Sequence, residues 1–102
     1  MAQDFAIIEN YLMIKMPEEV GHYEAADISR TADHFLMNSK AKNVVFDFED
    51  TVLMDSSGIG VIIGRYRKVD CFGGKVFLIH CNKQIKRVIH MAGLLRYVEM
   101  MN

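Results

Sequence analysis

Tryptophan is absent from this sequence of 102 residues, and proline occurs only once. With one proline and seven glycines, the chain is neither collagen-like nor of low complexity. No uncharged apolar run approaches the ~18 residues of a membrane span, and no basic region precedes an apolar stretch at the N-terminus. We therefore expect no membrane segment and no signal peptide.

Cysteine is also scarce. Cys71 and Cys81 form neither a Cys-x-x-Cys pair nor the framework of a disulfide-rich protein. Isolated thiols stay reduced in the cytoplasm, whereas secreted domains of this size usually carry several disulfides. We therefore expect a cytoplasmic protein with two reduced thiols.

The composition is that of a folded domain, with 51% hydrophobic and 25% charged residues. A chain of this length buries roughly two-thirds of the surface that it exposes when unfolded, so it can form a stable core without disulfides or a structural metal. These values exclude intrinsic disorder. We expect a single domain over residues 1–102.

Charge is distributed unevenly although the net charge is only −1. Residues 1–50 hold ten acidic and four basic residues, and residues 51–102 hold three acidic and eight basic ones. The bases are not interleaved with aromatic residues for stacking, which argues against direct nucleic-acid binding and favours a polar protein partner. We expect a solvated helix face, or the rim of a binding surface that steers an acidic partner, at Arg65, Arg67 and Lys68.

Apolar periodicity and capping residues divide the chain into eight elements. Strand–helix–strand units connect right-handedly and form a parallel sheet, to which an opening hairpin adds an antiparallel pair. The predicted fold class is a small mixed α/β sheet with helices packed on it, in the order β-β-α-β-α-β-α-β. The elements are strands over 5–9 and 11–16 around a turn at Asn10, a helix between Gly21 and Asn38, a strand over 43–48, a helix that follows the turn over 55–58 and ends at Gly73-Gly74, a strand over 76–79, a helix from Asn82 to Gly93, and a strand over 97–100.

The most informative stretch is the strand-to-helix turn Asp55-Ser56-Ser57-Gly58-Ile59-Gly60-Val61. By local rules alone, aspartate and serine at a helix start cap free backbone N–H groups. Two adjacent serines, however, leave one hydroxyl available when the other caps. Glycines at 58 and 60 allow another protein to approach closely, and a helix N-terminus favours an anion such as a phosphate.

These residues resemble the STAS domains of the anti-sigma factor antagonist family, and the sporulation-type antagonists in particular. The specific core is Asp-Ser-Ser-Gly-x-Gly-Val at a strand–helix junction, and the resemblance continues through 44–50 and 85–94. It implies a non-enzymatic protein that, when unphosphorylated, binds an anti-sigma factor that is also a serine kinase, and so frees the sigma factor. The kinase would then phosphorylate Ser57 and dissociate, and a serine phosphatase would reset the cycle.

Ser57 is therefore the predicted phosphoacceptor of a protein that we expect to be monomeric when free. Asp55 would shape the turn, and Ser56 would be the neighbouring cap. Ile59 either contacts the partner or belongs to the core. The predicted partner-binding surface consists of Asp55, Ser56, Gly58, Ile59, Gly60 and Val61.

Two departures from the family pattern bear on this interpretation. Gly21 stands where the family commonly has an aspartate, which puts any partner or nucleotide contact of that aspartate in doubt. Many family members also continue past the last strand into a further helix, so the edge or groove there is expected to be open or filled differently.

Other functions fit the residues less well. The alternative that stays open is a STAS regulatory subunit of a transport or stress-signalling assembly that is not switched at Ser57. The segment Asp47-Phe48-Glu49-Asp50-Thr51 departs from the Asp-x-Asp-x-Thr of aspartate-dependent phosphatases, and Asp55 replaces the first glycine of a serine-hydrolase elbow. We expect no enzyme activity.

No cofactor or metal is expected either. Gly58-x-Gly60 lacks the third glycine of a dinucleotide fingerprint, so close packing explains these glycines better, and a weak nucleotide affinity at the helix start stays open. The four histidines show no metal-ligand spacing among themselves or with Cys81: His22, His34, His80 and His90.

Overall fold

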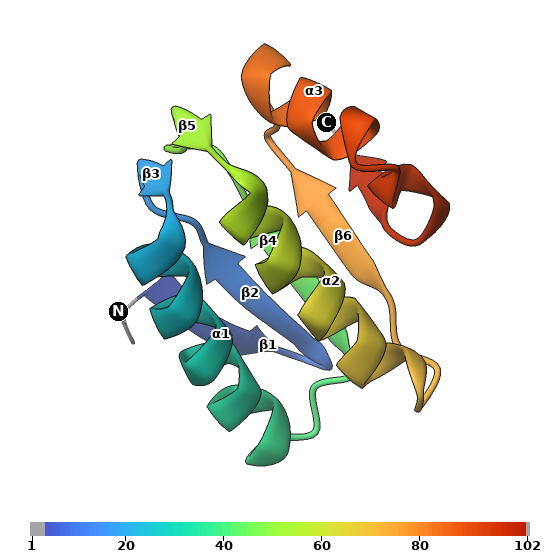
Figure 1. Ribbon diagram of the computed structural model, residues 1–102. Helices are drawn as coiled ribbons and strands as arrows, with labels where there is room; N and C mark the ends of the chain where they lie inside the picture. The colour runs from blue at the N-terminus through green and yellow to red at the C-terminus, as the bar shows by residue number, and fades with distance from the viewer. Residues whose placement is uncertain (1–3, 102) are drawn as a thin grey trace.

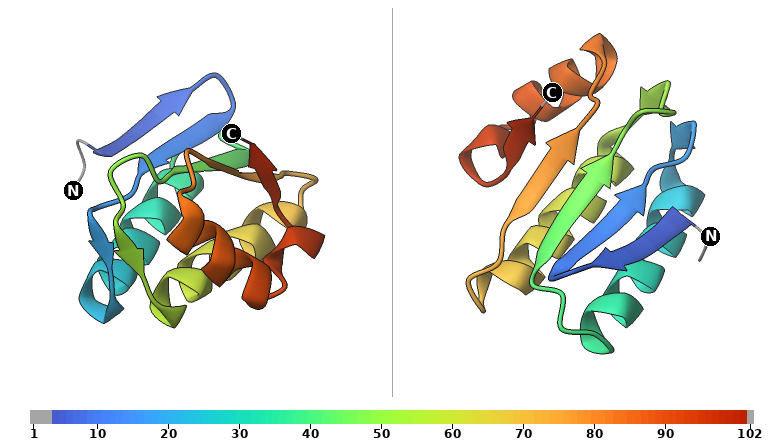
Figure 2. Two further views of the ribbon diagram at one scale, coloured as in Figure 1. Left: turned by 90° about the horizontal axis from the view of Figure 1, so that it is seen from above. Right: turned by 180° about the vertical axis from the view of Figure 1, so that it is seen from behind.

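The computed structural model describes residues 4–101, which form one layer of sheet and one layer of helices (Figures 1 and 2). Among these residues no helix is long and apolar enough to cross a bilayer. The elements in chain order are β1 (Phe5–Ile8), β2 (Tyr11–Lys15), β3 (Glu19–Val20), α1 (His22–Met37), β4 (Asn43–Asp47), β5 (Leu53–Met54), α2 (Ser56–Asp70), β6 (Val76–Ile79), α3 (Lys83–Met91), the 3-10 helix η2 (Leu94–Arg96) and β7 (Glu99–Met101).

The main sheet has the strand order β1-β2-β4-β6-β7. Only β1 is antiparallel to its neighbour, and the other four strands are parallel. Figure 2 shows α1, α2 and α3 on the same face of this sheet. The predicted mixed α/β fold is thereby confirmed.

The core lies between the sheet and the helices. Side chains in register on adjacent strands, such as Ile14, Phe46 and Leu78, are fully buried there. Ile28 of α1 and Ile62 of α2 are likewise fully buried. In β4, Val44, Val45 and Phe46 are all buried, as expected of a central strand whose residues are apolar in succession.

Helix ends follow the predicted signals closely. The Asn82 side chain accepts a hydrogen bond from the N–H of Ile85 at 2.9 Å, which confirms it as the cap of α3. Gly73 has φ 81°, and the N–H of Gly74 donates to the carbonyl of Val69, as in a Schellman motif that closes α2. Gly93, with φ 72°, follows α3 in the same left-handed conformation.

Several boundaries differ from the predictions. The opening hairpin turns at Glu9 and Asn10, so β1 ends one residue early, and α2 begins at Ser56 within the predicted turn. The last strand begins at Glu99 because η2 occupies the segment before it. The sequence prediction also missed the short strands β3 and β5, which form a separate parallel pair.

Candidate functional site

The predicted phosphoacceptor lies where two helices begin side by side. Strands β3 and β5 pair in parallel, with Val20 opposite Met54, and the N–H of Asp55 donates to the Val20 carbonyl at 3.2 Å. Each strand leads directly into a helix, so the starts of α1 and α2 are brought together (Figure 1). The unpaired N–H groups at both starts make this end of the molecule favourable for negative charge.

Asp55 caps α2. Its Oδ1 accepts the N–H of Ser57 at 2.8 Å, and its backbone is extended, as at a typical N-cap. The expected capping role of Ser56 is therefore wrong: Ser56 is the first helical residue and its side chain is exposed. Capping by the aspartate leaves both serine hydroxyls unused by the helix.

Ser57 is half-buried at the edge of an open groove between α1 and α2. Its hydroxyl makes no hydrogen bond to any residue between 4 and 101. The groove has a volume of about 260 Å³. It is lined by His22, Ala25, Ala26 and Ser29 of α1 and by Ser57, Gly60 and Val61 of α2.

The two glycines have different roles. A Cβ at Gly60 would meet no atom of residues 4–101 within 4 Å, so this position leaves the groove open to an approaching protein. A Cβ at Gly58 would clash with Cγ of Met54, which is only 2% exposed. Gly58 is therefore required for packing inside the molecule, and not for approach from outside as expected.

The predicted partner surface is consequently smaller than the sequence suggests. Asp55, Ser56 and Gly60 are exposed, and Ile59 is half-buried against the core. Val61 is 1% exposed, so its side chain belongs to the core and offers a partner almost no surface. Helical spacing explains this result, because residues 58 and 61 are three apart and share the inward face of α2.

Exposed apolar side chains near this turn were not predicted. Val52 and Leu53 precede the cap by two or three residues and are 62% and 51% exposed, and Tyr23 at the start of α1 is 84% exposed. Exposed apolar groups beside the predicted phosphoacceptor are suited to contact with another protein. The two-residue strand that holds Leu53 is too short to give a periodic signal in the sequence.

Gly21 is the cap residue of α1 and lies close to Asp55. Its N–H donates to Oε1 of Glu24 at 3.0 Å. A Cβ at this position would be 3.2 Å from that oxygen and 3.8 Å from Oδ2 of Asp55. An aspartate in place of Gly21 would therefore add a third carboxylate to this turn, and the glycine keeps the surroundings of Asp55 less negative.

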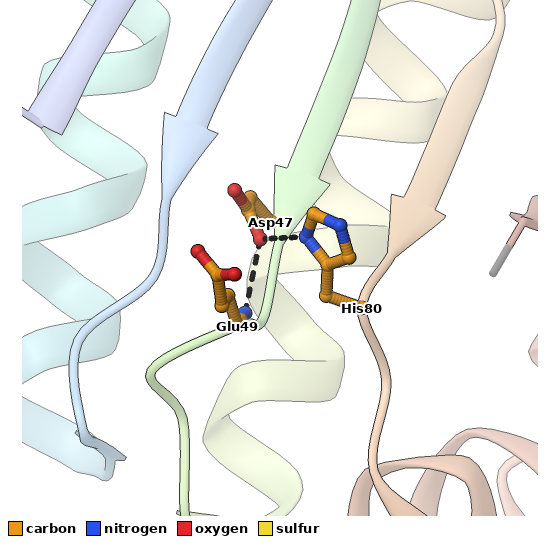
Figure 3. Close-up of side chains that lie close together, drawn as sticks. All are labelled: Asp47, Glu49 and His80. Atoms are coloured by element: carbon orange, nitrogen blue, oxygen red, sulfur yellow. Dashed lines mark hydrogen bonds and ion pairs between the residues drawn. The ribbon is translucent and has the colours of Figure 1, made fainter.

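A second polar cluster lies at the ends of β4 and β6 (Figure 3). Asp47 Oδ1 lies 2.8 Å from Nδ1 of His80, and it also accepts the N–H of Glu49. Within the described part of the chain, Asp47, Glu49 and His80 could offer a metal ion ligand atoms within 4.8 Å of one another. The charge of Glu49 is already countered by Lys15, whose Nζ lies 3.5 Å away.

Hydrogen bonding shifts the pKa values of both His80 and Asp47. The hydrogen bond to Asp47 raises the pKa of His80 above its ordinary value of 6.5. Partial burial would raise the pKa of Asp47, but hydrogen bonds from His80 and from the Glu49 N–H outweigh it, so this pKa is lowered. No local pattern in the sequence indicates the pair, because 33 residues separate its members.

This pair should stabilise the fold in a pH-dependent manner. The folded-state pKa of His80 is raised. Its contribution to the free energy of unfolding is therefore complete below about pH 6.5 and is lost as the pH rises through the raised value. At the acidic end, the contribution of Asp47 disappears as the pH falls below about 3.9. His80→Asn should therefore destabilise the protein more at about pH 5.5 than at about pH 9, as measured by urea unfolding.

Asparagine is a suitable replacement because it tolerates the left-handed φ of 58° at this position. Titration of the His80 ring protons by NMR gives an independent measurement. We expect a midpoint above 6.5 in the wild type and a lower midpoint in Asp47→Asn. A wild-type midpoint at or below 6.5 would contradict the interaction.

Comparison with known proteins agrees with this architecture. The anti-sigma F factor antagonist of Paenibacillus polymyxa is 27% identical over 85 residues, which cover 83% of this chain and 73% of that protein. The structure of the anti-sigma factor antagonist SpoIIAA in its unphosphorylated form has a TM-score of 0.85 at 20% identity, covering 96% of this chain and 86% of that one.

The Bacillus cell fate determinant SpoIIAA in the phosphorylated form has a TM-score of 0.75 at 21% identity, with 96% and 91% of the two chains covered. At these identities the structural likeness concerns the fold alone. A sequence model of the STAS domain matches residues 2–102. The chain therefore belongs to the STAS domain family.

Proposed function

We propose that this chain is an anti-sigma factor antagonist of the bacterial cytoplasm that is switched by phosphorylation of Ser57. The unphosphorylated chain, a monomer when free, binds an anti-sigma factor that is also a serine kinase, and the sigma factor is released. The kinase transfers the γ-phosphoryl group of ATP to Oγ of Ser57, the hydroxyl proton is lost to a base, and ADP leaves. The complex then dissociates until a serine phosphatase removes the phosphate.

The observation that carries this proposal is the position of Ser57. Its hydroxyl has no hydrogen-bond partner between residues 4 and 101, and it borders an open groove beside Gly60. The positive end of α2 has no acidic residue in its first turn, so a phosphate there gains from the helix dipole. The relative from Paenibacillus polymyxa, whose name is that of an antagonist, supports the same function.

Phosphopeptide mass spectrometry tests the proposal directly. The chain is incubated with ATP and the serine kinase of the histidine-kinase-like ATPase type from the same genome. We expect one phosphate, located on Ser57, and none on Ser57→Ala. Ser56→Ala is the matched control, since it removes the adjacent exposed hydroxyl and should leave phosphorylation of Ser57 intact.

The outcome also separates the two candidate functions. Phosphorylation of Ser56 instead of Ser57 would contradict the assignment of the acceptor. If the kinase binds the chain but modifies neither serine, the chain acts as a regulatory subunit that is not switched here.

A further inference from the structure

A second groove lies at the edge of the helical layer that is away from α1. It has a volume of about 460 Å³ and is formed by α3, η2 and β7, which are adjacent in Figures 1 and 2. Leu95, which is 48% exposed, and the half-buried Met100 supply its apolar lining. The remaining lining residues are all exposed and all come from α3: Lys83, Lys86, Arg87 and His90. We call these six residues the α3 groove.

The positive charge of the α3 groove is not compensated. Helix α3 contains no acidic residue, and within residues 4–101 none of Lys83, Lys86 and Arg87 is in an ion pair. Within residues 4–101, five of the twelve lysines and arginines are in ion pairs, such as Arg30, 3.1 Å from Asp27, and Lys75, 3.6 Å from Glu99. Lys83, Lys86 and Arg87 differ from the other unpaired bases because all three border one groove, and this clustering needs an explanation.

Stability of the helix does not explain why these three cations lie together. Lys83 is in the first turn of α3, where the helix dipole favours acidic residues. Lys83 and Arg87 are also four residues apart on one helix face, and like charges at this spacing destabilise a helix by ~0.2–0.5 kcal/mol per pair. Residues that cost the helix stability are best explained by an interaction outside the domain.

We propose that the α3 groove is a docking site for an acidic, amphipathic segment of a protein partner. An apolar side chain of the segment lies against Leu95 and Met100, and its carboxylates lie opposite Lys83, Lys86 and Arg87. This combination of a hollow apolar lining and a charged border corresponds to the groove mode of helix recognition.

The lining argues against nucleic acids and anionic membranes, which could also be attracted to the positive charge. Among residues 4–101, no phenylalanine, tyrosine or tryptophan lines the α3 groove, so unpaired bases would find only the His90 ring on which to stack. The apolar residues of the lining are Leu95 and Met100 alone, whereas a helix that binds a bilayer surface buries a whole apolar face. A protein segment satisfies both features.

This site is separate from the surface at Ser57. The two grooves have no lining residue in common, and the groove beside Ser57 lies between α1 and α2. Docking at the α3 groove is therefore independent of the charge on Ser57, and the proposal does not rest on the antagonist function. It predicts binding that survives in Ser57→Asp and weakens with added salt.

The test uses a fluorescent peptide of about 15 residues, with leucines at positions i, i+3, i+4 and i+7 and glutamates elsewhere. Binding is measured by fluorescence anisotropy. We expect Lys86→Glu/Arg87→Glu to weaken binding at least about tenfold, because it reverses two charges of the site. Leu95→Ser should weaken binding without changing any charge.

Lys40→Glu/Lys42→Glu is the matched control. It changes the net charge by the same amount, at two exposed lysines of the loop between α1 and β4. This variant should bind the peptide within about twofold of the wild type if local complementarity is responsible. Amide chemical shifts of the wild type should change in α3, η2 and β7 on adding the peptide.

Several results would overturn the proposal. The first is equal loss of binding in both double variants, since this would reflect net charge alone. The second is tighter binding of duplex DNA or phosphatidylserine vesicles than of the peptide at the same salt. The third is dimerisation of the wild type that is lost in Lys86→Glu/Arg87→Glu, because a second copy would then occupy the groove.

Discussion

Ser57→Asp is expected to weaken binding to the anti-sigma factor at least about a hundredfold, and phosphorylation of Ser57 about a thousandfold. Ser57→Ala should bind nearly as well as the wild type. Titration calorimetry with the purified anti-sigma factor from the same genome provides the measurement. The proposed switch thus predicts that affinity follows the charge at one position of an unchanged fold.

The magnitude follows from the surroundings of Ser57. A phosphate adds ~1.5–2 negative charges at neutral pH. Asp55, whose Oδ1 already accepts the N–H of Ser57, is two residues away. At an assumed separation of ~6 Å and an effective dielectric constant of ~20, two unit charges repel by roughly 3 kcal/mol before screening. Loss of water at an interface adds to this cost, because an unpaired charge there is poorly solvated.

Ser57→Asn distinguishes charge from size. Asparagine has the shape of aspartate without its charge, so we expect this variant to bind within about tenfold of the wild type. Equal weakening by asparagine and aspartate would assign the effect to steric exclusion. If Ser57→Ala and Ser57→Asp bound the partner equally well, the switch itself would be wrong.

Elements defined by local signals could be predicted from the sequence. The cap at Asn82 and the left-handed glycines at 73 and 93 act within one helical turn, and the structure confirms all three. The apolar run of β4 likewise needs only its immediate neighbours to indicate a buried strand. The order of strands and helices follows from such signals together with the handedness of crossovers.

The remaining features depend on contacts between distant segments. The sequence predicts Arg65 in solvent, but it is 6% exposed because the half-buried Asp33 of α1 provides it with a partner. The His80–Asp47 pair likewise requires the alignment of β4 and β6. At the candidate site, local signals in the sequence were sufficient to find the strand-to-helix turn, and Ser57 stays its predicted phosphoacceptor. The burial of Gly58 became apparent only from packing against Met54.

Asp33→Ala is expected to lower the free energy of unfolding by ~3 kcal/mol, because it leaves the Arg65 guanidinium buried without its counter-charge. Arg65 Nε lies 3.1 Å from Oδ1 of Asp33, and this contact joins α2 to α1. Neither Nε nor Nη1 of Arg65 makes a hydrogen bond within residues 4–101, so Asp33 is the main compensation there for the buried charge. Burial lowers the pKa of Arg65, and the charge of Asp33 opposes this.

Arg65→Met is expected to cost much less, within about 1 kcal/mol, because it removes the buried charge and keeps an apolar side chain of similar length. Asp33 would then keep its other partner, since Nζ of Lys68 lies 3.2 Å from its Oδ2 and its side chain is 25% exposed. The asymmetry between the two variants arises because the arginine is the more deeply buried member of the pair.

The double variant Asp33→Ala/Arg65→Met completes the cycle. We expect it to be more stable than Asp33→Ala alone, because the methionine eliminates the charge that the aspartate no longer balances. Urea unfolding at neutral pH gives all three values, with unchanged slopes showing that the folded and unfolded states are comparable. Additive costs for the two substitutions would show that Asp33 and Arg65 do not interact, and that the buried arginine is stabilised by other means.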